Sequence, residues 1–189
     1  GLGYYAWKKE QERIAGIAAY AAQVGAEYFP HAADLSGGWF SGPSGIGRVV
    51  AKAQAFGAKG PFEKGHSRKA SHALLFPDEE RLRLTSFDYE YKITTSNGKS
   101  TQTTTYPFRV LIGEVPMHLP PLELEPEHLG HRIAEKFGMR EIEFELDEFN
   151  RKYFVRCSDR EGAFALLNQQ MMEHLLQAHP FQVVCAGPH

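Results

Sequence analysis

The sequence has few cysteines, almost no net charge and no long apolar run. Two cysteines, Cys157 and Cys185, are too few for the disulfide framework of a small secreted domain, and their apolar neighbours predict buried, inert thiols. A formal net charge of −2 gives no general attraction to nucleic acid. No stretch reaches the ~20 apolar residues of a spanning helix, so a complete span and a cleavable signal peptide are both absent from this sequence.

The composition that is present indicates one folded domain. Of the 189 residues, 42% are hydrophobic and 12% aromatic, which is enough for one substantial core. We expect this domain at residues 61–189. It should follow an N-terminal helix at 10–30 and a glycine-rich linker with a short helix at 31–60.

Residues 1–9 resemble the end of a membrane-spanning helix. Tyr4, Tyr5 and Trp7 are rings that collect at the bilayer interface, and Lys8 and Lys9 follow as a charged flank. No initiator Met precedes them, so we expect a longer protein with one membrane anchor and a water-exposed domain. Basic residues beside a span favour the cytoplasmic side. The alternative is that the three rings pack under the domain as an ordinary helical turn.

A glycine-rich loop between residues 36 and 47 carries two large aromatic side chains, Trp39 and Phe40. Its pattern is neither a nucleotide P-loop, which ends in Gly-Lys-Ser/Thr, nor the dinucleotide fingerprint that follows a strand. We interpret it as a connector. Its aromatic side chains either cap the core or form a docking patch.

The middle of the chain predicts a long β-hairpin. Residues 82–95 and 100–115 are rich in aromatic, β-branched and threonine residues, and Asn97-Gly98 between them is a strong hairpin signal. Apolar residues alternate along both strands, so one face should lie on the core. The tip, residues 94–105, is almost wholly Thr, Ser, Asn, Gln and Lys. It should project into water, where its edge could accept a partner strand.

The predicted fold class is α+β, with an antiparallel sheet built on this hairpin and packed against a C-terminal helix. Ser158 stands three residues before Glu161, as in a capping box at a helix start. One helical face would then carry Phe164, Leu167, Met171, Leu175 and Ala178.

Histidines are the main candidates for chemistry. His128 and His131 share a predicted helical face with Glu135, an arrangement that could hold a metal if a further donor came from elsewhere. We favour a polar surface there, and we expect no metal and no cofactor. His66 and His72 lie close to two serines, but no nucleophile-elbow pattern surrounds either serine.

A basic cluster occupies the same segment: Lys64, His66, Arg68 and Lys69. We interpret it as a loop that faces anions, such as the headgroups of a nearby membrane, or as an ordinary solvated loop.

Two patches of the sequence resemble uncharacterised bacterial membrane-anchored proteins, including the group catalogued as domain of unknown function 3137. The first patch comprises 142–145, 148–155, Asp159, Ala163, 166–167, 171–172 and 175–176. The second comprises 60–62, 65–70, Leu74 and 87–91. The resemblance implies an N-terminal spanning region and an α+β domain, and it implies no activity.

The functional hypothesis is a non-enzymatic, membrane-tethered interaction or scaffold domain, an accessory part of a bacterial membrane complex. Its ligands would be partner proteins, with self-association left open and no role for nucleic acid. The working surfaces would be the Trp39-Phe40 loop, the 64–69 segment and the hairpin tip at Asn97-Gly98. The alternatives are a hydrolase that uses His66 and His72 or the His128-His131 pair, and a lipid- or peptide-binding module.

Overall fold

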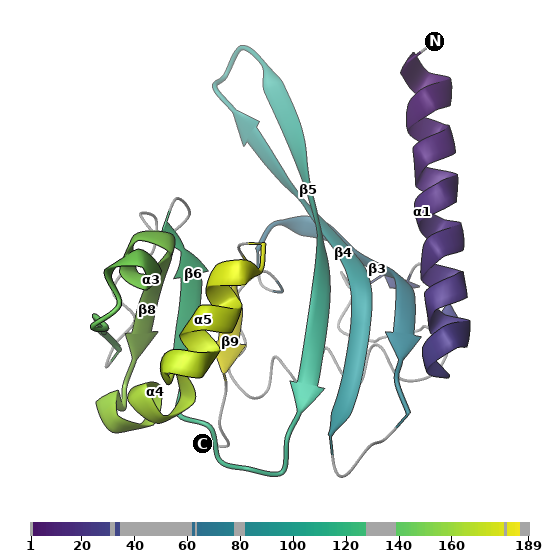
Figure 1. Ribbon diagram of the computed structural model, residues 1–189. Coiled ribbons are helices and arrows are strands. Elements are labelled where there is room, and N and C mark those ends of the chain that lie inside the picture. The colour runs from purple at the N-terminus through teal and green to yellow at the C-terminus, as the bar shows by residue number, and fades with distance from the viewer. Residues whose placement is uncertain are drawn as a thin grey trace. The chain divides into compact units, whose positions relative to one another are not determined.

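The computed structural model has helices and antiparallel sheets, so the α+β class is confirmed (Figure 1). It describes residues 2–30, 33–34, 62, 64–77, 82–127, 139–179 and 181–185. These residues form two compact units, one up to Pro116 (unit 1) and one from Met117 onward (unit 2). The division lies within the range 61–189, which the sequence suggests as one domain.

Unit 1 contains an antiparallel sheet in which β1, β3, β4 and β5 lie in that order, and β2 also pairs with β3. The strands are β1 (Glu27–Phe29), β2 (Ala33–Asp34), β3 (His66–Leu75), β4 (Arg83–Ser96) and β5 (Thr101–Glu114). The predicted hairpin is β4 and β5, whose register runs unbroken from Arg83 opposite Glu114 to Ser96 opposite Thr101.

One face of this sheet is the core of unit 1, as the alternation predicts. Phe87, Tyr89 and Tyr91 project from β4 to this face and are at most 8% exposed. Phe62 packs edge-on against Tyr89, with ring centroids 5.1 Å apart. Burial raises the pKa of Tyr89 to about 12. The core is therefore an aromatic row along the hairpin.

Helix α1 (Leu2–Val24) is longer at its start and shorter at its end than the sequence predicts. Because proline cannot continue a helix, the sequence predicts that this helix ends near Phe29-Pro30. That prediction is wrong. Gly25 adopts a left-handed φ of +68°, and the amide of Ala26 donates to the Ala21 carbonyl at 2.9 Å. This is a Schellman end, which stops the helix before proline can, so the next residues are free to form β1.

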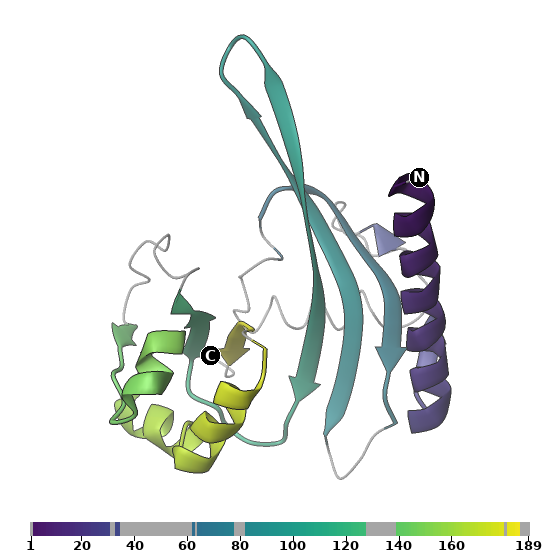
Figure 2. The same ribbon diagram turned by 45° about the horizontal axis from the view of Figure 1, so that its top comes forward.

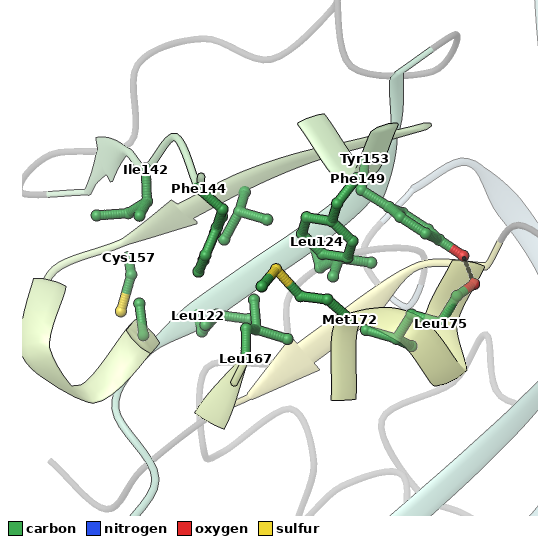
Figure 3. Packing of buried hydrophobic residues seen from close by; sticks show 12 residues of the cluster. Leu122, Leu124, Ile142, Phe144, Phe149, Tyr153, Cys157, Leu167, Met172 and Leu175 are labelled. Atoms are coloured by element: carbon green, nitrogen blue, oxygen red, sulfur yellow. Dashed lines mark hydrogen bonds between the residues drawn. The ribbon is translucent and has the colours of Figure 1, made fainter. Parts of the chain in front are cut away.

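Unit 2 contains a second antiparallel sheet in the order β7-β8-β6-β9. Its strands are β6 (Leu122–Pro126), β7 (Arg140–Glu141), β8 (Tyr153–Cys157) and β9 (Val183–Cys185). Helices α3 (Asp147–Lys152), α4 (Arg160–Leu166) and α5 (Gln169–Gln177) pack on one face of it. Figure 3 shows side chains of β6 and β8, among them Leu124 and Tyr153, meeting Met172 and Leu175 of α5.

The C-terminal helix differs from the prediction in its start and its continuity. Asp159, not Ser158, caps α4 by accepting from the Gly162 amide at 3.1 Å. The helix is then interrupted at Leu167. Asn168 caps a second helix, because its side chain accepts a hydrogen bond from Met171 N at 3.0 Å. Asn and Asp side chains compete for backbone amides in this way and so favour caps over helix interiors.

The end of α5 is held by a lysine. Lys152 Nζ donates to three carbonyls, those of Leu175, Leu176 and Ala178, at 3.2, 2.5 and 2.8 Å. The Tyr153 hydroxyl also donates to the Leu175 carbonyl at 3.1 Å, the dashed line in Figure 3. These bonds satisfy carbonyls that a helix end leaves unpaired, and they place a positive charge at the negative end of the helix dipole.

Candidate functional site

Four side chains in the first turns of α1 form an exposed group, which we call the aromatic turn: Tyr4, Tyr5, Trp7 and Lys9. The three rings are 58–69% exposed. Tyr4 and Trp7 stack at a centroid distance of 5.9 Å, and Lys9 Nζ lies 5.0 Å from the centre of the Tyr5 ring. Tyr4 and Trp7 contact each other, Tyr5 contacts Lys9, and all three rings are mostly open to solvent, so the alternative that they pack under the domain does not describe them. Across the described part of the chain, no helix is both long enough and apolar enough to cross a membrane.

Helix α1 is attached to the sheet through its second half. Arg13 donates to Glu10 at 2.7 Å and to Asp88 of β4 at 2.8 Å, and the same bonds raise the pKa of Arg13. Closer to the helix end, the Tyr20 ring packs edge-on against Phe76 at 6.4 Å. Ala21 is buried, whereas the described side chains from Gly3 to Arg13 are all exposed. The first turns of α1 therefore extend away from the packed part of unit 1.

The two contacts fix the direction of α1 relative to the hairpin. Phe76 follows the end of β3 that lies farthest from the hairpin tip, and Asp88 is further along β4 toward that tip. Going from Tyr20 to Arg13 along α1 is therefore going toward the tip. Both views show that α1 begins on the side toward which the hairpin extends (Figures 1 and 2). The aromatic turn and the hairpin tip thus lie at the same end of unit 1.

The hairpin projects past its neighbouring strand. The pairing of β3 with β4 stops at His66 opposite Lys92, so residues 93–104, which we call the arm, pair only with each other. The amide of Asn97 donates to the Ser100 carbonyl, and the Asn97 side chain accepts from the Lys99 and Ser100 amides. The two central residues of the turn are Gly98, at φ +82°, and Lys99. Asn97 closes the turn and is not one of its central residues.

The outer edge of β5 carries hydrogen-bonding groups. Phe76 N donates to the Leu84 carbonyl at 3.1 Å, so Leu84 and the other even-numbered residues of β4 face β3. Leu84 is opposite Gly113, which must then face outward, and alternation gives the same direction to Thr101, Thr103 and Thr105. Among the described residues β5 pairs with β4 alone. These outward amides and carbonyls form an open strand edge, and Pro107, which lacks an amide hydrogen, also points outward, as edge prolines do.

The basic residues of the 64–69 segment do not form one surface. The segment from His66 onward is strand β3, not the predicted loop, and its pairing shifts register around Ser67 and His72. Arg68 donates to the Phe62 carbonyl at 2.6 Å on the aromatic side of the sheet, whereas Lys69 is opposite Glu90 on the other side. An anion could not bind both side chains at once.

The histidines of β3 are also separated. His66 Nδ1 is 3.0 Å from Ser67 Oγ and its Nε2 is 2.9 Å from Thr94 Oγ1. His72 Nδ1 lies 2.8 Å from the Tyr28 hydroxyl on β1. Nowhere in the described ranges do three or more His, Cys, Asp or Glu side chains gather as metal ligands would. Trp39, Phe40, His128 and His131 lie outside the described residues.

Unit 2 holds a buried charged group that the sequence analysis missed. Arg156 NH2 lies 3.4 Å from Glu123 and 3.6 Å from Glu125, and all three residues are less than 10% exposed. The two glutamates alternate with Leu122 and Leu124, so they lie on the sheet face opposite the helices. The only available signal was a Leu-Glu-Leu-Glu alternation, which usually indicates a solvated face.

A pocket of about 590 Å³ in unit 2 is lined by residues of β7, β8 and the start of α4. Arg140, Glu141, Glu143 and Arg160 give it charges of both signs, and all four are exposed. Cys157, which also lines it, is 1% exposed, and Cys185 is half-buried with its pKa raised by burial. Neither thiol is in a disulfide, and the raised pKa keeps the Cys185 thiol protonated, which makes it a poor nucleophile.

Comparison of the chain with family models, curated proteins and solved structures finds no match. The candidate site therefore stands on its geometry alone: an exposed aromatic turn and an arm with an open edge, both at one end of unit 1.

Proposed function

We propose that this chain is a non-enzymatic interaction domain tethered to a membrane, an accessory part of a bacterial membrane complex. One observation carries the proposal: the aromatic turn of α1 and the β4–β5 arm extend from the same end of unit 1. Tyrosine and tryptophan rings followed by lysines suit the bilayer interface, where a spanning segment would precede them.

The partner would bind the edge of β5. An extended segment can add to an open antiparallel edge, with its backbone giving affinity and its side chains giving specificity. A second copy in the same membrane fits this edge poorly. Antiparallel pairing of two β5 strands would reverse the partner's strand and, with it, the direction of its α1. We therefore propose a different protein as the partner. The proposed position of the domain is the cytoplasmic side of the membrane, which the basic residues Lys8 and Lys9 favour.

The hydrolase alternative rests on the contact of His66 with Ser67. A histidine that activates a serine is normally oriented by a carboxylate on its other nitrogen. Here the Thr94 hydroxyl occupies that position, and His66 is exposed at the end of β3. This arrangement gives less support to catalysis than the open edge gives to partner binding.

Tethering predicts that Trp7 enters the interfacial layer of vesicles. The experiment uses the variant Trp39→Phe, which leaves Trp7 as the single tryptophan. Adding phosphatidylcholine–phosphatidylglycerol vesicles should shift Trp7 emission to shorter wavelength, because the ring leaves water. Replacing Tyr4, Tyr5 and Trp7 by serine should weaken vesicle co-sedimentation by about tenfold or more, since 1.4 kcal/mol already gives a factor of ten. Unchanged emission and no co-sedimentation would contradict the tether.

Partner binding through the edge predicts a different outcome for two substitutions at one residue. Thr103→Pro removes an outward amide without touching the bonds to β4, whereas Thr103→Val keeps that amide. Both variants lose the 2.9 Å hydroxyl contact with Thr94, so that loss cancels in the comparison. Partners captured from detergent extracts and identified by mass spectrometry should be lost with the proline variant and kept with the valine variant. Capture of the same proteins by both would exclude the β5 edge.

A further inference from the structure

The outer part of the hairpin carries a single sign of charge. Residues 91–113 include Lys92, Lys99 and Arg109 but no aspartate or glutamate, although the whole chain has a net charge of −2. Acidic residues resume immediately on either side, at Glu90 and Glu114. An anionic surface would therefore attract this part of the hairpin, although the chain as a whole has a slight negative charge.

The arm reaches at least as far as the aromatic turn. From the Arg13–Asp88 contact, Tyr4 lies nine residues back along α1, about 13 Å at 1.5 Å per residue. Ser96 lies eight residues along β4 from the same contact, about 26 Å at 3.3 Å per residue. A bilayer that takes up the aromatic turn would therefore also meet the arm.

The chemistry of the arm decides which layer of the membrane it can enter. Apart from Ile93, the arm consists of hydroxyl, amide and glycine residues and one lysine, and these residues are exposed. The open strand edge cannot enter hydrocarbon, because its amides and carbonyls would lose their water. Phosphates, by contrast, accept hydrogen bonds from hydroxyls and from a lysine ammonium. The headgroup layer is the one that matches the arm.

We infer that the arm tip binds anionic phospholipid headgroups, with Lys99 as its charged contact. The domain would then contact the membrane at two places, the aromatic turn and the arm tip. This inference rests on the proposed tether. These two membrane contacts, one at the start of α1 and one at the end of β4, fix how unit 1 is rotated on the membrane. Because the tip binds through Lys99 at its turn, the outward edge of β5 from Thr103 to Gly113 stays available to a partner.

The first test is charge reversal at the tip. Binding to vesicles that contain phosphatidylglycerol should fall about fivefold for Lys99→Ser, which corresponds to about 1 kcal/mol per lysine near an anionic surface, and further for Lys99→Glu. Lys99→Arg, the matched control, should bind like the original chain. On pure phosphatidylcholine all four proteins should bind equally. Equal binding of Lys99→Glu and Lys99→Arg to the anionic vesicles would overturn the inference.

The second test places an environment-sensitive fluorophore at the tip, on Ser100→Cys. The half-buried Cys185 is changed to serine, and a Cys185→Ser chain without the tip cysteine reports any labelling of buried Cys157. Anionic vesicles should shift the probe toward the emission of a less polar environment. If Trp7 shifts and the probe keeps its aqueous emission, the tether stands and the arm contact is wrong. If neither shifts, both proposals are wrong.

Discussion

Replacing Phe149 by alanine should lower the free energy of unfolding of unit 2 by about 3–5 kcal/mol, the usual cost of deleting a fully buried phenylalanine ring. Phe149 of α3 is 0% exposed. Its ring meets Phe144 edge-on at 5.5 Å and Tyr153 at 5.3 Å. Removing it leaves a cavity in the centre of the core shown in Figure 3, and a whole domain is commonly stable by only about 5–15 kcal/mol.

Phe164 provides the matched control. It also contacts Phe144 edge-on, at 5.0 Å, but it is 38% exposed. Phe164→Ala should therefore cost about 1 kcal/mol, because water already reaches that ring. Hydrogen exchange of the β6 and β8 amides measures the effect within unit 2. Equal loss of protection in the two variants would show that burial does not govern the contribution of these rings.

The hairpin and the fold class were predictable because their signals are local. Strand alternation on either side of Asn97-Gly98 fixed both strands, and the faces followed from a side-chain period of two. Strand β3 was not predictable in the same way. Ser67 and His72 adopt φ values of +52° and +49° at its two register shifts, so the alternation breaks where the strand bulges. A strand with two bulges lacks the regular alternation of a strand, so its sequence predicts a loop.

In unit 2 the prediction failed where side chains replace backbone bonds. Charged and apolar residues alternate over residues 141–146, which predicts a strand there, but β7 ends at Glu141. The Asn150 amide group then accepts from Phe144 N at 3.0 Å and donates to Phe144 O at 2.7 Å, so it takes the place of a neighbouring strand. This asparagine lies in α3, a segment that the sequence suggests is a turn. Such a contact requires knowing which segments meet.

Part of the candidate site was likewise predictable from the sequence, and part was not. The composition of the aromatic turn and of the hairpin tip marked both as exposed, and the structure exposes both. Their position at one end of unit 1 could not be predicted, because it depends on the contact between Arg13 and Asp88, which are 75 residues apart. The outward direction of Thr103 likewise depends on which strands flank β4. Long-range pairing, not residue type, determines these features.

Replacing Gly65 by alanine should destabilise unit 1 by about 2–5 kcal/mol, because two separate costs add at this residue. Gly65 has a left-handed φ of +63°, which costs an L-residue about 1–2 kcal/mol. An added Cβ would also overlap the Lys92 carbonyl oxygen and approach the Tyr91 ring at 2.8 Å, and overpacking of this kind typically costs about 1–3 kcal/mol. The backbone carbonyl cannot move without disturbing the start of the arm.

Gly98→Ala separates the two costs. Gly98 also has a positive φ, +82°, but nothing lies within 4 Å of the position its Cβ would take. It should lose only the conformational part, about 1–2 kcal/mol. Gly65 lies at the base of the arm and Gly98 in its turn, both within unit 1, so urea unfolding followed by circular dichroism compares them in one transition. A Gly65 variant no less stable than the Gly98 variant would mean that β3 can move away from β4 there, and the base of the arm would then be flexible where the proposed membrane contact needs it rigid.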